Sequence, residues 1–216
     1  MPFSLWITLL VACLVISFTP GAGAINTMGN SLNHGFRRSI WGILGQQAAL
    51  VIHIAIVALG VGVLVASSEF AFNVIRYAGA AYLVYLGIRQ MLAKPTLPGD
   101  DDDETDASGR ALAATSESRW SMFRRGLWVN LLNPKAIVFF LAFLPQFIRP
   151  GEPLWVQYLI VTVTVITVDI AVMWGFFAAA AHGFRRFTRT ARGQRTLNLV
   201  FGGLFIAVAL LLAFVH

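Results

Sequence analysis

Three ionisable side chains lie inside long apolar stretches of this sequence. His53 is the midpoint of one stretch, Asp169 lies close to the midpoint of another, and Lys135 lies within a third. A charge at the centre of a bilayer costs about 2.5 to 3.5 kcal/mol on insertion scales, so each of these residues needs a specific role. Counted from the basic ends of their stretches, the three lie at a similar depth, and we expect them to approach one another.

Two interpretations of Asp169 remain open at this point. Its carboxylate can bind a proton whose uptake and release are coupled to transport. Alternatively, Lys135 and Asp169 form a static ion pair that holds two helices together. For His53 the alternatives are a neutral hydrogen-bonding residue, which is the commoner case, and a direct proton carrier.

Two helix interruptions accompany these charges. Thr19-Pro20-Gly21 breaks the first apolar stretch, and Asn133-Pro134 breaks the fourth. Proline removes a backbone donor, and carbonyls freed inside a bilayer must be satisfied by protein, water or ligand. A single break can merely shape its helix, but paired breaks in corresponding helices indicate a transporter's binding site.

Amide side chains cluster near the two breaks. Asn26 and Asn133 lie nearest to them in sequence, where amides, bare carbonyls and a half-helix N-terminus can meet the charged groups of a zwitterion. Gln46 and Gln47 add amides to the second stretch, and some amides will bond helix to helix. The predicted substrate-binding residues are Thr19, Pro20, Gly21, Asn26, Asn130, Asn133, Pro134 and Gln146, and the predicted intramembrane charges are His53, Lys135 and Asp169.

Transmembrane helices must position these residues. Of 216 residues, 57% are hydrophobic and only 12% are charged, against roughly 25% charged in soluble domains. Because a span needs about 20 apolar residues, the chain has room for six spans and no separate soluble domain. We predict an all-α membrane protein with a single transporter domain, 1–216. The predicted spans are 5–26, 40–66, 72–92, 123–147, 154–181 and 197–215.

The basic residues predict the orientation of these spans. Most of the 16 Lys and Arg residues flank the first, third and fifth connections, and the positive-inside rule places those connections in the cytoplasm and both termini in the periplasm. The net charge of +6 is therefore a topology signal and not a nucleic-acid site. No Lys or Arg precedes the first apolar run, so we interpret it as a span and not as a signal peptide.

The longest connection, 93–122, divides the chain into halves 1–92 and 123–216 with three spans each. An odd number of spans per half means that any repeat between them is inverted in topology. The connection contains the acidic run 100–104, which we interpret as solvated charge in a disordered cytoplasmic linker, with a divalent-metal site as the sharper alternative. We attribute glycines of the spans, including Gly42, Gly45, Gly60, Gly62, Gly202 and Gly203, to close helix packing.

Several motifs together resemble the LysE/RhtB family of amino-acid exporters. They are SFTPGAGAINTM at 17–28, AGAAYL at 78–83, RGLWVNLLNPKA at 125–136 and PQF at 145–147. Most of the family has a second proline where this chain has Ala22, so the sequence is similar to the branch that exports homoserine, homoserine lactone and threonine. The resemblance implies efflux of such a substrate across a bacterial inner membrane, driven by proton antiport.

Other functions find less support in the residues. An intramembrane enzyme needs a nucleophile with a base, or metal ligands such as a His-Glu-x-x-His pair, and neither occurs at membrane depth. A facilitated channel for small polar solutes is the alternative to a coupled exporter. We expect an amino-acid substrate, protons and the lipid bilayer as partners, allow for a homo-oligomer, and expect no cofactor, metal or nucleic acid.

Overall fold

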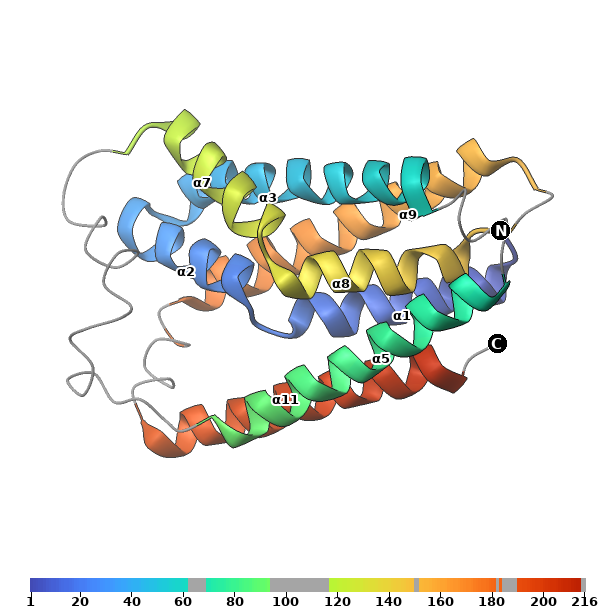
Figure 1. Ribbon diagram of the computed structural model, residues 1–216. Coiled ribbons are helices and arrows are strands. Elements are labelled where there is room, and N and C mark those ends of the chain that lie inside the picture. Colours follow the sequence, from blue (N-terminus) through green and yellow to red (C-terminus); the bar gives the residue numbers. More distant parts are fainter. Residues whose placement is uncertain (62–68, 94–116, 150–151, 182, 184–189, 215–216) are drawn as a thin grey trace.

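The computed structural model describes residues 1–61, 69–93, 117–149, 152–181, 183 and 190–214. Within these ranges the chain is helical and contains no strand, and its helices run broadly along one direction (Figure 1). The α-helices are α1 (Phe3–Phe18), α2 (Ala22–His34), α3 (Phe36–Ile56), α5 (Glu69–Leu92), α7 (Arg119–Leu131), α8 (Pro134–Phe143), α9 (Leu154–Ile170) and α11 (Ala191–Phe214). Three further helical segments are η1 (Val57–Val61), η3 (Leu144–Phe147) and η4 (Ala171–Ala178).

Two helical segments, Phe36–Gly60 and Leu154–Ala181, are long and apolar enough to cross a membrane. Two pairs of helices are each bent at a break. α1 and α2 meet at 58°, and α7 and the segment Pro134–Phe147 meet at 57°. If each bent pair crosses the membrane once, they contribute up to two more spans. The described residues thus contain two to four candidate spans by length and composition. The all-α class is confirmed, and the count of six spans stays a prediction.

Both predicted interruptions are real breaks, but the spans around them are longer than predicted. The first was expected to end at residue 26, whereas α2 continues to His34. The residues after the break are polar because they face protein and not lipid: Thr27 and Asn30 are completely buried. In the second half α7 begins at Arg119, where the Ser118 hydroxyl caps the helix by accepting from the Ser121 amide at 3.1 Å.

The second long helix of each half widens into a π-helical segment. η1 follows α3 at Val57, and η4 follows α9 at Ala171. Along the chain these two positions are separated by the same number of residues as Pro20 and Pro134. Single π-helical turns are rare and occur frequently at functional sites. The regularity first seen in the two breaks therefore extends to the next helix of each half.

Glycines bring α3 against α7 with backbone touching backbone. A Cβ atom added to Gly45 would overlap the carbonyl oxygen of Phe123, and one added to Gly126 would overlap that of Gly42. Only residues without a side chain allow two helices to approach this closely. The packing role predicted for Gly42 and Gly45 is confirmed.

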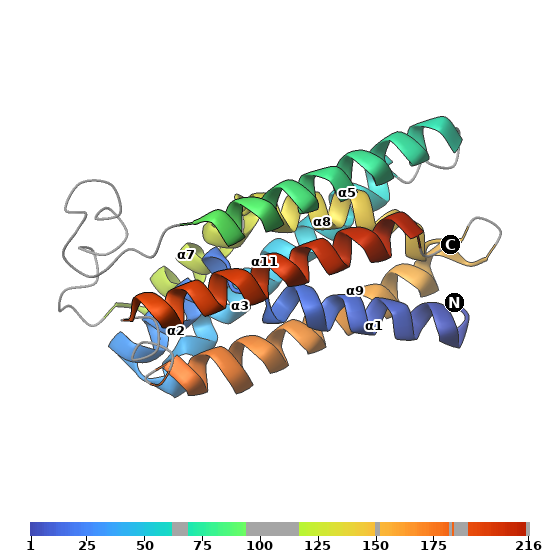
Figure 2. The same ribbon diagram turned by 90° about the horizontal axis from the view of Figure 1, so that it is seen from below.

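A second close crossing joins α5 to α11, which lie side by side along one flank of the bundle (Figures 1 and 2). A Cβ atom on Gly87 would lie 2.7 Å from the Gly202 carbonyl oxygen, and one on Gly202 would lie 2.6 Å from that of Gly87. The packing prediction is confirmed for Gly202 but wrong for Gly60 and Gly203, where an added Cβ would meet nothing within 4 Å among the described residues. Gly62 and the acidic run 100–104 lie outside the described residues.

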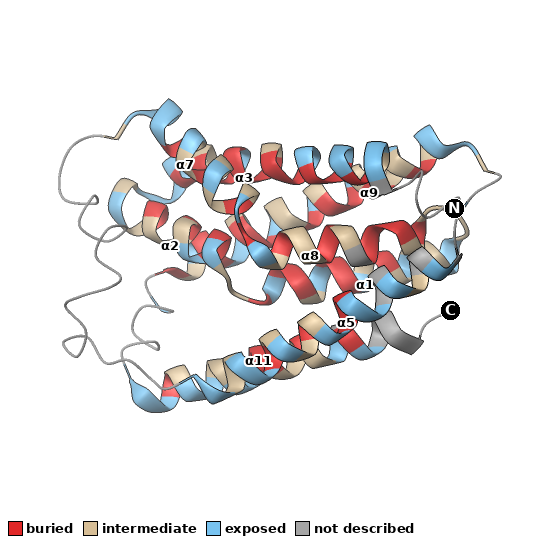
Figure 3. Cartoon of the chain, in the orientation of Figure 1, coloured by how far each residue is buried: buried red, intermediate tan, exposed pale blue. Residues whose placement is uncertain are grey.

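Both chain termini lie at one end of the bundle (Figure 1). The opposite end holds the start of α3 with Arg37 and Arg38, the start of α7 with Arg119, and the start of α11 with Arg192. Buried side chains gather on the inner faces of α1, α3, α8 and α9, whereas outward faces are exposed (Figure 3). This is the pattern of helices that pack on one another inside and present apolar side chains outside.

Candidate functional site

A cavity lies where the two broken helix pairs face each other. Its empty space amounts to about 550 Å³, a figure that includes its open mouth. Its wall is formed by both breaks together with α3, α9 and η4. The polar side chains that line it are Ser17, Gln46, Asn130, Asn133, Lys135 and Asp169.

The first break leaves backbone carbonyls that a side chain of the second half satisfies. Pro20 has no N–H, so the carbonyl of Ile16 has no helical donor. The ammonium of Lys135 donates to this carbonyl at 3.1 Å and to the carbonyl of Thr19 at 2.6 Å. Gly21 lies beside this contact, since an added Cβ would be 3.5 Å from the Lys135 Nζ atom. The cation thus caps the broken end of α1.

The second break is capped within its own helix and from α3. Asn133 precedes α8, and its Oδ1 atom accepts from the Lys135 amide at 3.1 Å while Pro134 occupies the first helical position. The carbonyl of Leu131 accepts instead from the Nε2 atom of His53 at 3.2 Å. Because the partner is a carbonyl, Nε2 must carry the proton.

His53 does not line the cavity. Its ring stacks on Phe140 with 5.7 Å between centroids, and its Nδ1 atom is buried without a hydrogen-bond partner in the part of the chain that the structure describes. The expected approach of His53 to Lys135 and Asp169 is not seen. A neutral and a protonated ring can both donate from Nε2 to a carbonyl, so both alternatives for His53 stay open.

Asp169 lies on the same cavity as Lys135 without pairing with it. Its Oδ1 atom accepts from the Ser17 hydroxyl at 3.1 Å, and its Oδ2 atom accepts from the Gln47 amide at 2.7 Å. Among the described residues no ion pair joins Lys135 to Asp169, so the static pair considered from the sequence is not formed. The site presents one cationic and one anionic group, each held separately by neutral partners.

A chain of amides connects the two breaks. The Nε2 atom of Gln46 donates to the Gly23 carbonyl at 3.1 Å and to the Thr27 hydroxyl at 3.0 Å. The Asn130 amide donates to the Gln46 carbonyl at 3.1 Å, and the Asn133 amide donates to the Asn130 side-chain oxygen at 3.5 Å. These bonds hold α2, α3, α7 and α8 in one arrangement around the cavity.

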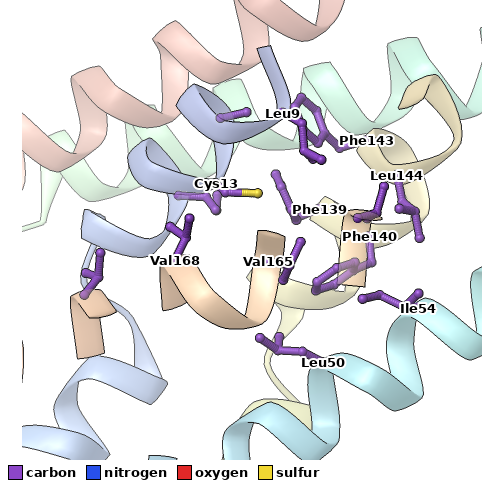
Figure 4. Close-up of a cluster of buried hydrophobic side chains, with 14 of the residues drawn as sticks. Leu9, Cys13, Leu50, Ile54, Phe139, Phe140, Phe143, Leu144, Val165 and Val168 are labelled. Atoms are coloured by element: carbon purple, nitrogen blue, oxygen red, sulfur yellow. The ribbon is translucent and has the colours of Figure 1, made fainter. Parts of the chain in front are cut away.

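Aromatic and aliphatic side chains form the remaining wall. Leu50 of α3, Phe139 and Phe140 of α8, and Val165 of α9 line the cavity and belong to a larger buried cluster (Figure 4). Cys13, the single cysteine of the chain, also contributes to the lining. The cavity therefore has a polar side at the breaks and an apolar side between α3, α8 and α9.

The other predicted site residues are not all brought together. Gly21, Asn130 and Asn133 line the cavity, and Thr19 contributes its carbonyl to Lys135. Asn26 lies against Gly42 of α3, with its amide nitrogen buried and without a partner among the described residues. Pro20 and Pro134 shape the breaks, and Gln146 lies in η3, outside the cavity lining.

Charged residues join three helices at the end of the bundle opposite the termini. Glu117 forms an ion pair with Arg125 at 2.9 Å, and its carboxylate lies 3.2 Å from the Nε2 atom of His34. Arg125 also donates to the side chain of Asn30, and Arg38 donates to the Glu117 carbonyl at 2.8 Å. This cluster ties the end of α2 and the start of α3 to the start of α7.

The model of the LysE type translocator family matches residues 14–215. This chain belongs to the LysE family. The homoserine/homoserine lactone efflux protein of Salmonella typhimurium is 43% identical over 213 residues, 99% of this chain and 98% of the relative. An uncharacterised membrane protein of Vibrio cholerae is 37% identical over 214 residues, 99% of this chain and 98% of the relative. A leucine efflux protein of Salmonella choleraesuis is 28% identical over 207 residues, 95% of this chain and 93% of the relative.

The family assignment confirms the resemblance drawn from the motifs. Members of the LysE family are translocators and not enzymes, and the match together with the apolar helices makes this chain a multi-pass protein of the bacterial inner membrane. No solved structure matches it.

Proposed function

We propose that this LysE-family protein exports a small neutral amino acid or derivative, namely homoserine, homoserine lactone or threonine, and that the cavity between the breaks is its substrate site. The observation that carries the proposal is that Lys135 and Asp169 both line one cavity inside an apolar bundle. Buried charges of this kind mark substrate and ion pathways in membrane proteins. The efflux activities named for the Salmonella relatives support this assignment.

The proposed topology has six spans, both termini in the periplasm and two halves of inverted orientation. The shared spacing of the prolines and of the π-helical segments supports the repeat. α5 and α11 have 24 residues each and are therefore about 36 Å long, enough for a hydrocarbon core of about 30 Å. The position of both termini at one end supports an even number of crossings.

Proton antiport is the proposed energy source, with Asp169 as the proton site. Both oxygens of this carboxylate accept hydrogen bonds from neutral donors, and within the described ranges no cation forms an ion pair with it. A proton and a substrate ammonium compete for the same carboxylate, and such competition couples their opposite movements. A channel lacks this competition.

Transport in proteoliposomes tests the proposal. Vesicles loaded with labelled threonine, homoserine or lysine are compared with and without an imposed pH gradient. We expect efflux of homoserine and threonine. The pH gradient should accelerate this efflux, and an uncoupler should return it to the rate measured without a gradient. Efflux that ignores the gradient would favour the channel, and export of lysine alone would contradict the substrate assignment.

Periplasmic termini predict that a C-terminal alkaline phosphatase fusion is active and a C-terminal green fluorescent protein fusion is dark.

A further inference from the structure

We infer that the cavity binds an amino acid in one orientation, with the α-carboxylate on Lys135 and the α-ammonium on Asp169. The inference rests on the proposed function and adds which residue of the cavity binds which charged group of the substrate. Lys135 and Asp169 are the charged residues of the described cavity lining. A zwitterion also carries one charge of each sign, so the two patterns are complementary.

Lys135 has bonding capacity left for a carboxylate. Its ammonium has three N–H donors, of which two are used on the carbonyls of Ile16 and Thr19. Among the described residues the third has no oxygen or nitrogen acceptor, and the centroid of the Phe205 ring lies 5.9 Å from the ammonium. The ammonium is therefore fixed in place by the protein and still offers one charged donor to a ligand.

The start of α2 adds to the attraction for an anion on this side of the cavity. Gly21 precedes α2 and makes no side-chain capping bond, and Gly23 and Ala24 of the first turn line the cavity. The first N–H groups of a helix lack helical partners and carry partial positive charge. A carboxylate placed near Lys135 also lies near these N–H groups. The anion site therefore rests on the charge of Lys135, and the start of α2 only adds to it.

Asp169 is the complementary partner for the substrate's ammonium. Each carboxylate oxygen accepts one hydrogen bond from the protein, and a carboxylate has about four acceptor positions in all. An ammonium can therefore bind without displacing Ser17 or Gln47. The substrate's two charged groups then bridge Lys135 and Asp169, which do not contact each other directly.

The same arrangement accounts for selection by side-chain charge. With Asp169 occupied by the α-ammonium, the described lining holds no second acid for a basic side chain. The remaining wall near Leu50, Phe139 and Phe140 is apolar. Burying an unpaired cation there is costly, so a lysine substrate is excluded while side chains the size of threonine or homoserine are accepted.

Homoserine and its lactone separate the two roles, because the lactone keeps the ammonium but has no carboxylate. Lys135→Gln removes the positive charge but keeps a polar N–H donor, on a side chain that is one bond shorter. We expect homoserine efflux from proteoliposomes to fall by on the order of tenfold or more, the effect of one charged hydrogen bond. Lactone efflux at mildly acidic pH, corrected for leakage through empty vesicles, should fall much less than homoserine efflux. Lys135→Arg, which keeps the charge, retains most homoserine efflux.

Asp169→Asn provides the opposite comparison, since both compounds carry the ammonium and both should lose efflux. Thermal unfolding in detergent checks that each variant is folded. An equal loss of homoserine and lactone efflux in a folded Lys135→Gln variant would overturn the assignment of the carboxylate, while the proposed function would stand. Failure of the parent protein to export either compound would overturn the proposed function and this orientation with it.

Discussion

The Nζ atom of Lys135 lies 2.6 Å from the carbonyl oxygen of Thr19, so a residue of the second half closes the break in the first. The reverse contact is made by His53 of the first half on the carbonyl of Leu131. Each break thus depends on a side chain from the other half.

Replacing Asp169 by Asn tests the coupling group with little change in shape. The new amide oxygen can accept from Gln47, and its NH₂ group can donate to the hydroxyl of Ser17, so the local bonds are kept. We expect substrate efflux to fall by on the order of tenfold and to become insensitive to an imposed pH gradient. Ser17→Ala, which keeps the carboxylate, is the control and retains a response to the gradient. Equal acceleration of the Asn variant and the parent protein would remove Asp169 from the coupling role.

Two substitutions of His53 separate a hydrogen-bonding role from a proton-carrying one. His53→Gln keeps an N–H donor for the Leu131 carbonyl, whereas His53→Phe leaves that carbonyl buried without a partner. We expect the Phe variant to lose about 1 to 3 kcal/mol of stability and the Gln variant to transport like the parent protein. Thermal unfolding in detergent and gradient-driven efflux are the measurements. A Gln variant that is stable but uncoupled would show that His53 carries protons.

The crossing of α3 and α7 predicts a sharp difference between two glycines. A Cβ at Gly126 would overlap the Gly42 carbonyl, while a Cβ at Gly29 of α2 meets nothing within 4 Å. Gly126→Ala should separate the two helices and lower the unfolding temperature. Gly29→Ala should leave it unchanged or raise it, because alanine favours a helix by about 1 kcal/mol over glycine. Similar melting curves for the two variants would contradict the close crossing.

Cys13 offers a native probe of the cavity, since the chain contains no other cysteine. It is buried and lines the cavity beside Ile16 and Ser17. We expect a small methanethiosulfonate reagent to reach it slowly and to block efflux, and we expect bound homoserine or threonine to slow the reaction. Cys13→Ala should transport normally and resist the reagent. Labelling that is equally fast with and without substrate would place the substrate elsewhere.

The sequence predicted the breaks and the two charges that line the cavity, because prolines and ionisable residues stand out against an apolar background. It did not distinguish His53 from Lys135 and Asp169, since depth along a helix says nothing about which face a side chain occupies. Asn26 was expected at the site because it is near the first break in sequence. More than a full turn separates it from Gly21, and it lies against Gly42 of α3 instead.

Sequence reasoning missed Ser17, and it named Gln46 and Gln47 as amides of the second stretch without assigning their partners. Ser17 and Gln47 hold Asp169, and Gln46 connects α2 to α7. Two adjacent glutamines in the middle of an apolar stretch were a usable signal, since each amide buried there needs partners. The helix ends at residue 34 and residue 119 were missed because both lie in polar sequence that is buried against protein or capped, which a search for apolar runs cannot recognise.

The crossed contacts of the two breaks also bear on how the polypeptide is assembled during synthesis. The ribosome completes α1 and its break long before it reaches residue 135, so the carbonyls of Ile16 and Thr19 enter the bilayer without their eventual donor. Water or the insertion machinery must serve them in the interval. A nascent chain that ends at the linker would therefore lack the donor for these carbonyls until the second half is supplied as a separate polypeptide.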